Sequence, residues 1–113
     1  MKKMIFFASF FVLLCRQWVV AHPPEAVTIH YESETHILSI VVKHDTPNVE
    51  KHYIDEIKIE RNGAELIVQE IAFQMNSDKQ EAQYLITDLR EGDELKITAH
   101  CNVYGKKTEV FRL

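Results

Sequence analysis

The sequence predicts an all-β fold, and three observations lead to that expectation. Apolar and polar residues alternate along several short segments, the period of two that is typical of half-buried strands. After residue 21, no segment of useful length repeats its apolar residues every 3.6 positions, as an amphipathic helix would. Turn-forming residues separate the segments at short intervals. The 113 residues therefore fit one domain with one small core.

The amino-terminal residues 1–21 have the pattern of a secretory signal peptide. Met1-Lys2-Lys3 is a basic start, Met4 to Cys15 is an apolar run of 12 residues, and Val19-Val20-Ala21 is a small-residue cleavage site. An uncut membrane anchor is the alternative, but the run falls short of the roughly 20 apolar residues that a spanning helix needs. We expect cleavage, no membrane attachment afterwards, an exported protein in the periplasm, and one domain over residues 22–113.

Seven strands are expected in that domain. In chain order they are Val27 to Tyr31, Ile37 to Lys43, Tyr53 to Glu60, Glu65 to Phe73, Glu81 to Thr87, Glu94 to Cys101 and Lys107 to Leu113. The third and sixth show the clearest alternation, with Ile57 and Ile59 on one side of the third and Leu95 and Ile97 on one side of the sixth. Asn62-Gly63 predicts a tight hairpin turn between the third and fourth. Polar loops are expected at residues 75–80 and 88–93.

Seven strands in about 90 residues, with no linker and no internal repeat, predict a seven-stranded immunoglobulin-like β-sandwich. In that topology the second-to-third loop, the sixth-to-seventh loop and the start of the first strand lie at the same end. Three segments should therefore converge: His22-Pro23-Pro24, residues 44–52 and residues 101–105.

The remaining histidines should lie elsewhere. His30 and His36 flank the first hairpin and belong at the opposite end. His100 should face away from Cys101, because neighbouring residues of a strand alternate. We expect these three to take no part in a site.

Charge excludes two classes of partner. Residues 1–21 contain Lys2, Lys3 and Arg16 and no acidic residue, so their removal leaves 10 basic and 17 acidic side chains and a net charge of −7. Nucleic acid and anionic membranes are poor partners for such a surface. Paired carboxylates for hydrolysis, a glycine-rich phosphate loop and a Ser-His-Asp arrangement are also absent from the sequence pattern.

The cysteine left after cleavage, Cys101, has no partner for an internal disulfide. With His44 and His52 at the same end, it forms a constellation that suits iron, copper or zinc, because imidazole and thiolate are ligands of these metals. The alternative is structural: both histidines lie on the loop surface and Cys101 fills the rim of the core. The residues alone leave both interpretations open.

Two stretches carry a family resemblance. They are His44-Asp45-Thr46-Pro47-Asn48-Val49-Glu50-Lys51-His52-Tyr53-Ile54 and Ala99-His100-Cys101-Asn102-Val103-Tyr104-Gly105. In this order they resemble the iron domain of superoxide reductases, also called desulfoferrodoxin or neelaredoxin. The resemblance covers most of residues 22–113. It implies an immunoglobulin-like fold and ferrous iron held by four imidazoles and an axial thiolate, with His44, His52 and Cys101 at three of the five ligand positions.

The sequence also departs from that pattern. Tyr104 stands where the family has a ligating histidine, and the interval from His44 to His52 is two residues longer than usual. The family's first imidazole belongs to a Lys-His-x-Pro segment; His22 lies near that position, without the lysine that helps to attract superoxide. Lys51 or Lys43 is the candidate to steer the anion instead. A phenolate from Tyr104 would be a hard ligand that favours ferric iron.

Three functions remain open. The first is an exported, superoxide-reductase-like oxidoreductase that binds Fe²⁺, with weakened or lost reduction of superoxide to hydrogen peroxide by electrons from an external donor. The second is a non-catalytic binding module that holds no metal. The third is a copper or zinc protein on the same scaffold, in which His22, as a new amino terminus, could chelate copper through its amine and ring.

Overall fold

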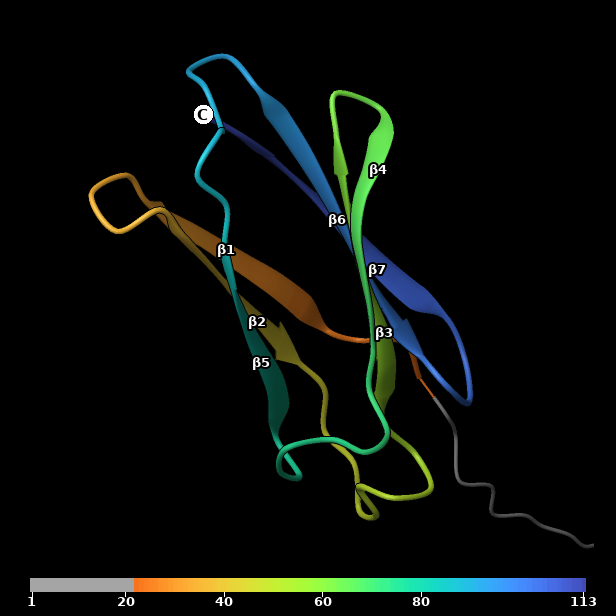
Figure 1. The fold of residues 1–113 in the computed structure, drawn as a ribbon. Helices are drawn as coiled ribbons and strands as arrows, with labels where there is room; N and C mark the ends of the chain where they lie inside the picture. The colour runs from red at the N-terminus through yellow and green to blue at the C-terminus, as the bar shows by residue number, and fades with distance from the viewer. Residues whose placement is uncertain (1–21) are drawn as a thin grey trace, which may run out of the picture.

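The computed structural model describes residues 22–113 and shows two antiparallel sheets packed face to face (Figure 1). The predicted signal peptide and its cleavage site lie outside the described residues. The seven strands are β1 (Ala26–Glu32), β2 (Ile37–Lys43), β3 (Ile54–Arg61), β4 (Ala64–Glu70), β5 (Lys79–Leu85), β6 (Glu94–Cys101) and β7 (Lys106–Arg112). Within the part of the chain described, no helix has the length and apolar character needed to cross a membrane.

The sheets have the strand orders β1-β2-β5 and β4-β3-β6-β7. β4 pairs with β3 because Asn62 and Gly63, with φ of 50° and 87°, form the tight turn that the sequence predicts. A two-residue turn of this kind places β4 antiparallel beside β3. The all-β, seven-stranded sandwich predicted from the sequence is confirmed.

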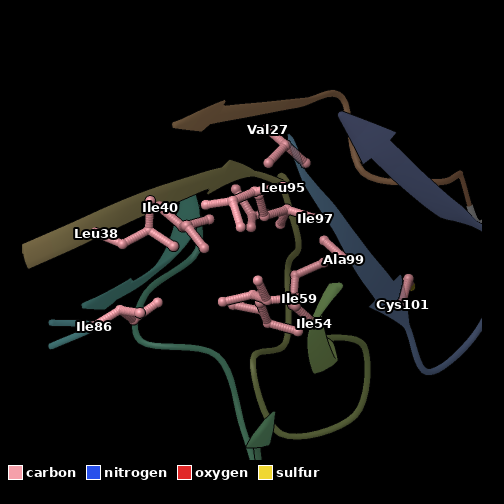
Figure 2. Packing of buried hydrophobic residues seen from close by; sticks show 12 residues of the cluster. Val27, Leu38, Ile40, Ile54, Ile59, Ile86, Leu95, Ile97, Ala99 and Cys101 are labelled. Atoms are coloured by element: carbon pink, nitrogen blue, oxygen red, sulfur yellow. The ribbon is translucent and has the colours of Figure 1, made fainter. Parts of the chain in front are cut away.

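The core lies between the sheets and is built from alternate residues of β2, β3 and β6 (Figure 2). Leu38 and Ile40 of one sheet face Ile57, Ile59 and their neighbours in the other, and all are essentially inaccessible to solvent. Burial of one aliphatic side chain of this size contributes about 1.5–3 kcal/mol. The apolar period of two therefore fixes which face of each strand points inward.

The expected bounds of two strands, β4 and β5, are wrong by two or more residues. β4 ends at Glu70 rather than Phe73, because Ile71 donates its N–H to the carbonyl of Asp55 and the chain then leaves the sheet. Phe73 is 57% exposed, whereas Gln74 is buried. β5 runs from Lys79 to Leu85 rather than over residues 81–87. The residue after it, Ile86, donates its N–H to the carbonyl of His36 in the β1–β2 turn.

The three segments predicted to converge, His22-Pro23-Pro24, residues 44–52 and residues 101–105, do so at one end of the sandwich, where Pro23 also lies against Gly105. The connections β2–β3 and β4–β5 lie together there, at the bottom of Figure 1. His44 and Thr46 donate their N–H groups to the carbonyls of Asp78 and Ser77, which joins these two connections. Asn102, at the β6–β7 turn, donates its N–H to the carbonyl of Tyr53 and so brings residues 101–105 to the same end.

Candidate metal centre

His44, His52 and Cys101 come together at this end. Their possible ligand atoms all lie within 4.8 Å of one another, although the residues are up to 57 positions apart in the sequence. His44 and Cys101 are fully buried and His52 is half-buried. The sequence-based expectation that the three side chains approach within about 8 Å is therefore confirmed.

Each residue of this trio is placed by its own backbone contacts. His44 directly follows β2, and His52 donates its N–H to the carbonyl of Asn48 at 2.9 Å, which closes a turn in the connection β2–β3. Cys101 is the last residue of β6 and donates its N–H to the carbonyl of Gly105 at 3.0 Å. One loop, the connection β2–β3, and the end of β6 thus present two imidazoles and one thiol to the same small volume.

Gln74 orients the ring of His44. Its Oε1 accepts hydrogen bonds from the backbone N–H of Ile54 (3.1 Å) and from Nδ1 of His44 (2.8 Å), and its Nε2 donates to the carbonyls of His44 (2.8 Å) and Asn76 (2.9 Å). The contacts to backbone groups fix which end of the amide is oxygen. Nδ1 of His44 therefore donates to Oε1, and in the neutral ring Nε2 keeps its lone pair, as in a metal-ligating histidine.

The Nε2 atoms of His44 and His52 are buried and have no hydrogen-bond partner among residues 22–113. A buried polar atom without a partner costs about 1–3 kcal/mol, so native proteins rarely retain one without a reason. Burial, with the proximity of His44 and then of His22, lowers the pKa of His52. A lowered pKa favours the neutral imidazole, which is the form that binds a metal.

Asn102 ties the loop that carries His52 to the turn that follows Cys101. Its side-chain oxygen accepts the N–H of Tyr53 at 2.8 Å, and its side-chain nitrogen donates to the carbonyl of Lys51 at 3.0 Å. The two groups flank His52 in the sequence. Asn102 therefore holds the histidine and the cysteine of the centre in a fixed relation.

His22 lies beside the trio. Its ring centroid is 6.0 Å from that of His44 and 6.2 Å from that of His52, while the rings of His44 and His52 are 4.8 Å apart. His22 is half-buried. The structure therefore brings this residue, proposed from the sequence as a further ligand, to the edge of the centre.

The other proposed site residues lie on the surface around it. Tyr104 is 59% exposed in the β6–β7 turn, and Lys51 is exposed in the connection β2–β3. Lys43 forms an ion pair with Asp45 at 2.9 Å, and this hydrogen bond raises the pKa of Lys43. Because Asp45 offsets its charge, Lys43 is a poorer candidate than Lys51 to attract an anion.

The three histidines expected to be bystanders have separate contacts. His36 lies in the β1–β2 turn, where its Nδ1 contacts the hydroxyl of Tyr31 at 3.2 Å, and His30 is paired with Ser39 within the β1–β2 ladder. His100 is exposed and its Nδ1 is hydrogen-bonded to the carboxylate of Asp55 at 2.7 Å, on the face of β6 opposite to buried Cys101.

Gln74 is the residue of this centre that sequence reasoning missed. The sequence predicts a strand that ends at Phe73 and places Gln74 in the loop just after it. A glutamine between Phe73 and Met75 belongs to no motif and to no alternating pattern that would predict its burial. Its burial becomes understandable only when His44, 30 residues away, supplies the opposing polar groups.

Comparisons with known proteins bear on the fold. No protein-family model matches the sequence, and no curated protein matches it. Among solved structures, a superoxide reductase (1Fe-SOR) from Giardia intestinalis is similar, with a TM-score of 0.58 and 23% sequence identity, over 82% of this chain and 98% of that one. The resemblance that residues 44–54 and 99–105 first indicated thus extends over the whole sandwich. The chain has the fold of a superoxide reductase.

Proposed function

We propose that the protein is a superoxide-reductase-like iron protein in which His44, His52 and Cys101 hold Fe²⁺. The observation that carries this proposal is the pair of buried Nε2 atoms without a hydrogen-bond partner beside the buried thiol of Cys101. A metal ion is the ligand that would satisfy all three at once. The similarity in fold to a superoxide reductase supports iron as that metal.

The donor set fits the proposed ion. Neutral imidazoles and a thiolate bind ferrous iron, and the hydrogen bond that Nδ1 of His44 donates to Oε1 of Gln74 is of the kind that orients a ligating ring. The same donors also suit copper or tetrahedral zinc. Elemental analysis of the protein purified from its natural source distinguishes these metals.

The proposed reaction converts superoxide, one electron and two protons into hydrogen peroxide. Bound ferrous iron would supply the electron, and solvent would supply the protons. The residues of this chain would contribute the rest: His44 and His52 would hold the ion, and the thiolate of Cys101 would donate charge to it. Exposed Lys51 would attract the anion through its field. An external donor must restore the electron after each turnover.

We expect this activity to be weak for three reasons. An imidazole expected from the family resemblance is replaced by Tyr104, which lies largely in solvent. Lys43 is neutralised by Asp45. A net charge of −7 for residues 22–113 repels superoxide.

The experiment that tests the proposal measures the decay of pulse-generated superoxide at equal iron loading for three proteins. They are the wild type, Tyr104→His, and Val103→His as the matched control, because Val103 is similarly exposed in the same turn. Tyr104→His should bind Fe²⁺ more tightly and react faster than the other two. A wild-type rate near the diffusion limit would refute the predicted weakness, and absence of iron binding in all three would favour a binding module without a metal.

Export belongs to the same proposal. Cleavage after Ala21 would release residues 22–113 into the periplasm with the centre assembled on one domain. Fractionation of the natural host, followed by determination of the intact mass, tests this. A cytoplasmic protein that retains residues 1–21 would contradict it.

A further inference from the structure

The segment that precedes β1 is fixed against the proposed metal centre. Pro24 is buried, and Glu25 donates its N–H to the carbonyl of Lys43 at 2.8 Å. Pro23 packs on the β6–β7 turn so closely that a Cβ added to Gly105 would lie 2.8 Å from the Cβ of Pro23. The position of His22 is therefore restrained by its neighbours on the chain: Pro23 lies against the turn that follows Cys101, and Glu25 is bonded to the residue before His44.

His22 presents two nitrogens at the edge of the centre. Its half-buried ring lies about 6 Å from the rings of both His44 and His52. Its Nδ1 has one long contact, 3.3 Å from the carbonyl of Pro23, which a stronger ligand bond would replace. The backbone nitrogen of the same residue is separated from Nδ1 by four covalent bonds, so both can bind one metal ion in a six-membered chelate ring.

The chemical state of that backbone nitrogen depends on proteolysis. In the uncleaved chain it is an amide and has no lone pair to offer a metal. The sequence predicts cleavage between Ala21 and His22, which converts it into a free α-amine. Pro23 has no N–H, so the next backbone nitrogen cannot become a ligand, and the chelate is limited to the amine and the ring.

We propose that the α-amine of His22, created by cleavage after Ala21, is a ligand of the same metal ion as His44, His52 and Cys101. Processing would then complete the centre, and the uncleaved precursor would bind the metal more weakly. The donor set would be three imidazoles, one amine and one thiolate, which suits a divalent first-row transition ion. This inference rests on the proposed function. It adds a ligand to the centre and makes tight metal binding depend on cleavage after Ala21.

The test compares the Fe²⁺ and Zn²⁺ affinities of three forms of residues 22–113. The first begins at His22 with a free amine. The second carries one additional glycine before His22, which keeps the ring and replaces the amine of His22 by an amide. The third is His22→Ala with a free amine. A tethered donor acts at a high effective concentration, so the first form should bind each ion at least about tenfold more tightly than the other two.

A second measurement reports on the amine directly. An amine-acylating reagent should modify the α-amine of the first form in the absence of metal and much more slowly with saturating Zn²⁺, as read by peptide mass spectrometry. Lys58 of β3 and Lys96 of β6, which are outside the proposed donor set, serve as internal controls. Their acylation rates should be unaffected by Zn²⁺.

The outcomes separate this inference from the proposed function. Equal affinities for the first two forms, or an amine that acylates equally fast with and without Zn²⁺, would overturn the role of the α-amine and leave the centre of His44, His52 and Cys101 intact. Absence of metal binding in all three forms would overturn the proposed function and this inference together. A natural protein that begins at any residue other than His22 would overturn the role of processing.

Discussion

The substitution Gln74→Met tests how the metal centre is held in place, because Gln74 is bonded to His44 but is not itself a proposed metal ligand. The substitution keeps the length of the side chain and removes its four hydrogen bonds, to Nδ1 and the carbonyl of His44, the N–H of Ile54 and the carbonyl of Asn76. At least three of the groups left behind are buried. Each buried group without a partner costs about 1–3 kcal/mol, so three such groups should lower the free energy of unfolding by about 3–9 kcal/mol.

Urea unfolding of the metal-free, reduced protein measures this loss. Gln74→Glu keeps an acceptor for His44 and Ile54 and loses the two donated hydrogen bonds, so its stability should lie between those of the wild type and Gln74→Met. Gln83→Met is the matched control, because Gln83 is exposed on β5 and its substitution should change the free energy of unfolding by less than about 0.5 kcal/mol.

The same variants test the orientation of the His44 ring. Loss of the group that orients a ligating histidine typically lowers metal affinity about 10–100-fold, and we expect a loss of this size for Gln74→Met under conditions in which it is folded. If Gln74→Met matched Gln83→Met in both stability and Fe²⁺ affinity, the role assigned to Gln74 would be refuted.

Three further substitutions test other parts of the structure. Gly105→Ala should lower the free energy of unfolding by roughly 1 kcal/mol more than Gly92→Ala, since both have positive φ but only Gly105 packs against Pro23; equal losses in urea unfolding would argue against that contact. Asn102→Ala should cost about 1–2 kcal/mol and speed amide hydrogen exchange at Tyr53, and unchanged exchange would contradict the link between the two loops. Burial raises the pKa of Tyr84 to about 12, so the stability of the wild type should fall between pH 10 and pH 12, where the unfolded phenol ionises first. Tyr84→Phe should lack this part of the pH dependence, as measured by urea unfolding across that range.

Much of the fold was predictable because local pattern and tertiary structure agree. The alternation along β6 and the apolar run of β2 place both strands at their observed bounds. The sandwich topology then brings His44, His52 and Cys101 to one end, because the β2–β3 connection and the carboxyl end of β6 lie at that same end.

The end of β4 and the role of Gln74 were not predictable from local pattern. A rule based on polarity buries Phe73 and exposes Gln74, and the structure does the reverse. The reason is that His44, Ile54 and Asn76 offer Gln74 a complete set of hydrogen bonds, which removes the cost of burying an amide. Such a set is assembled from distant segments, so no window of the sequence contains it.

The most direct test of the central claim is X-ray absorption spectroscopy of residues 22–113 loaded anaerobically with one equivalent of Fe²⁺, beside Cys101→Ala treated in the same way. The account predicts one sulfur and at least two imidazole nitrogens around the iron in the wild type, and the loss of the sulfur in Cys101→Ala. Iron surrounded only by oxygen and nitrogen in the wild type, or an identical spectrum for the two proteins, would contradict a metal centre built on His44, His52 and Cys101.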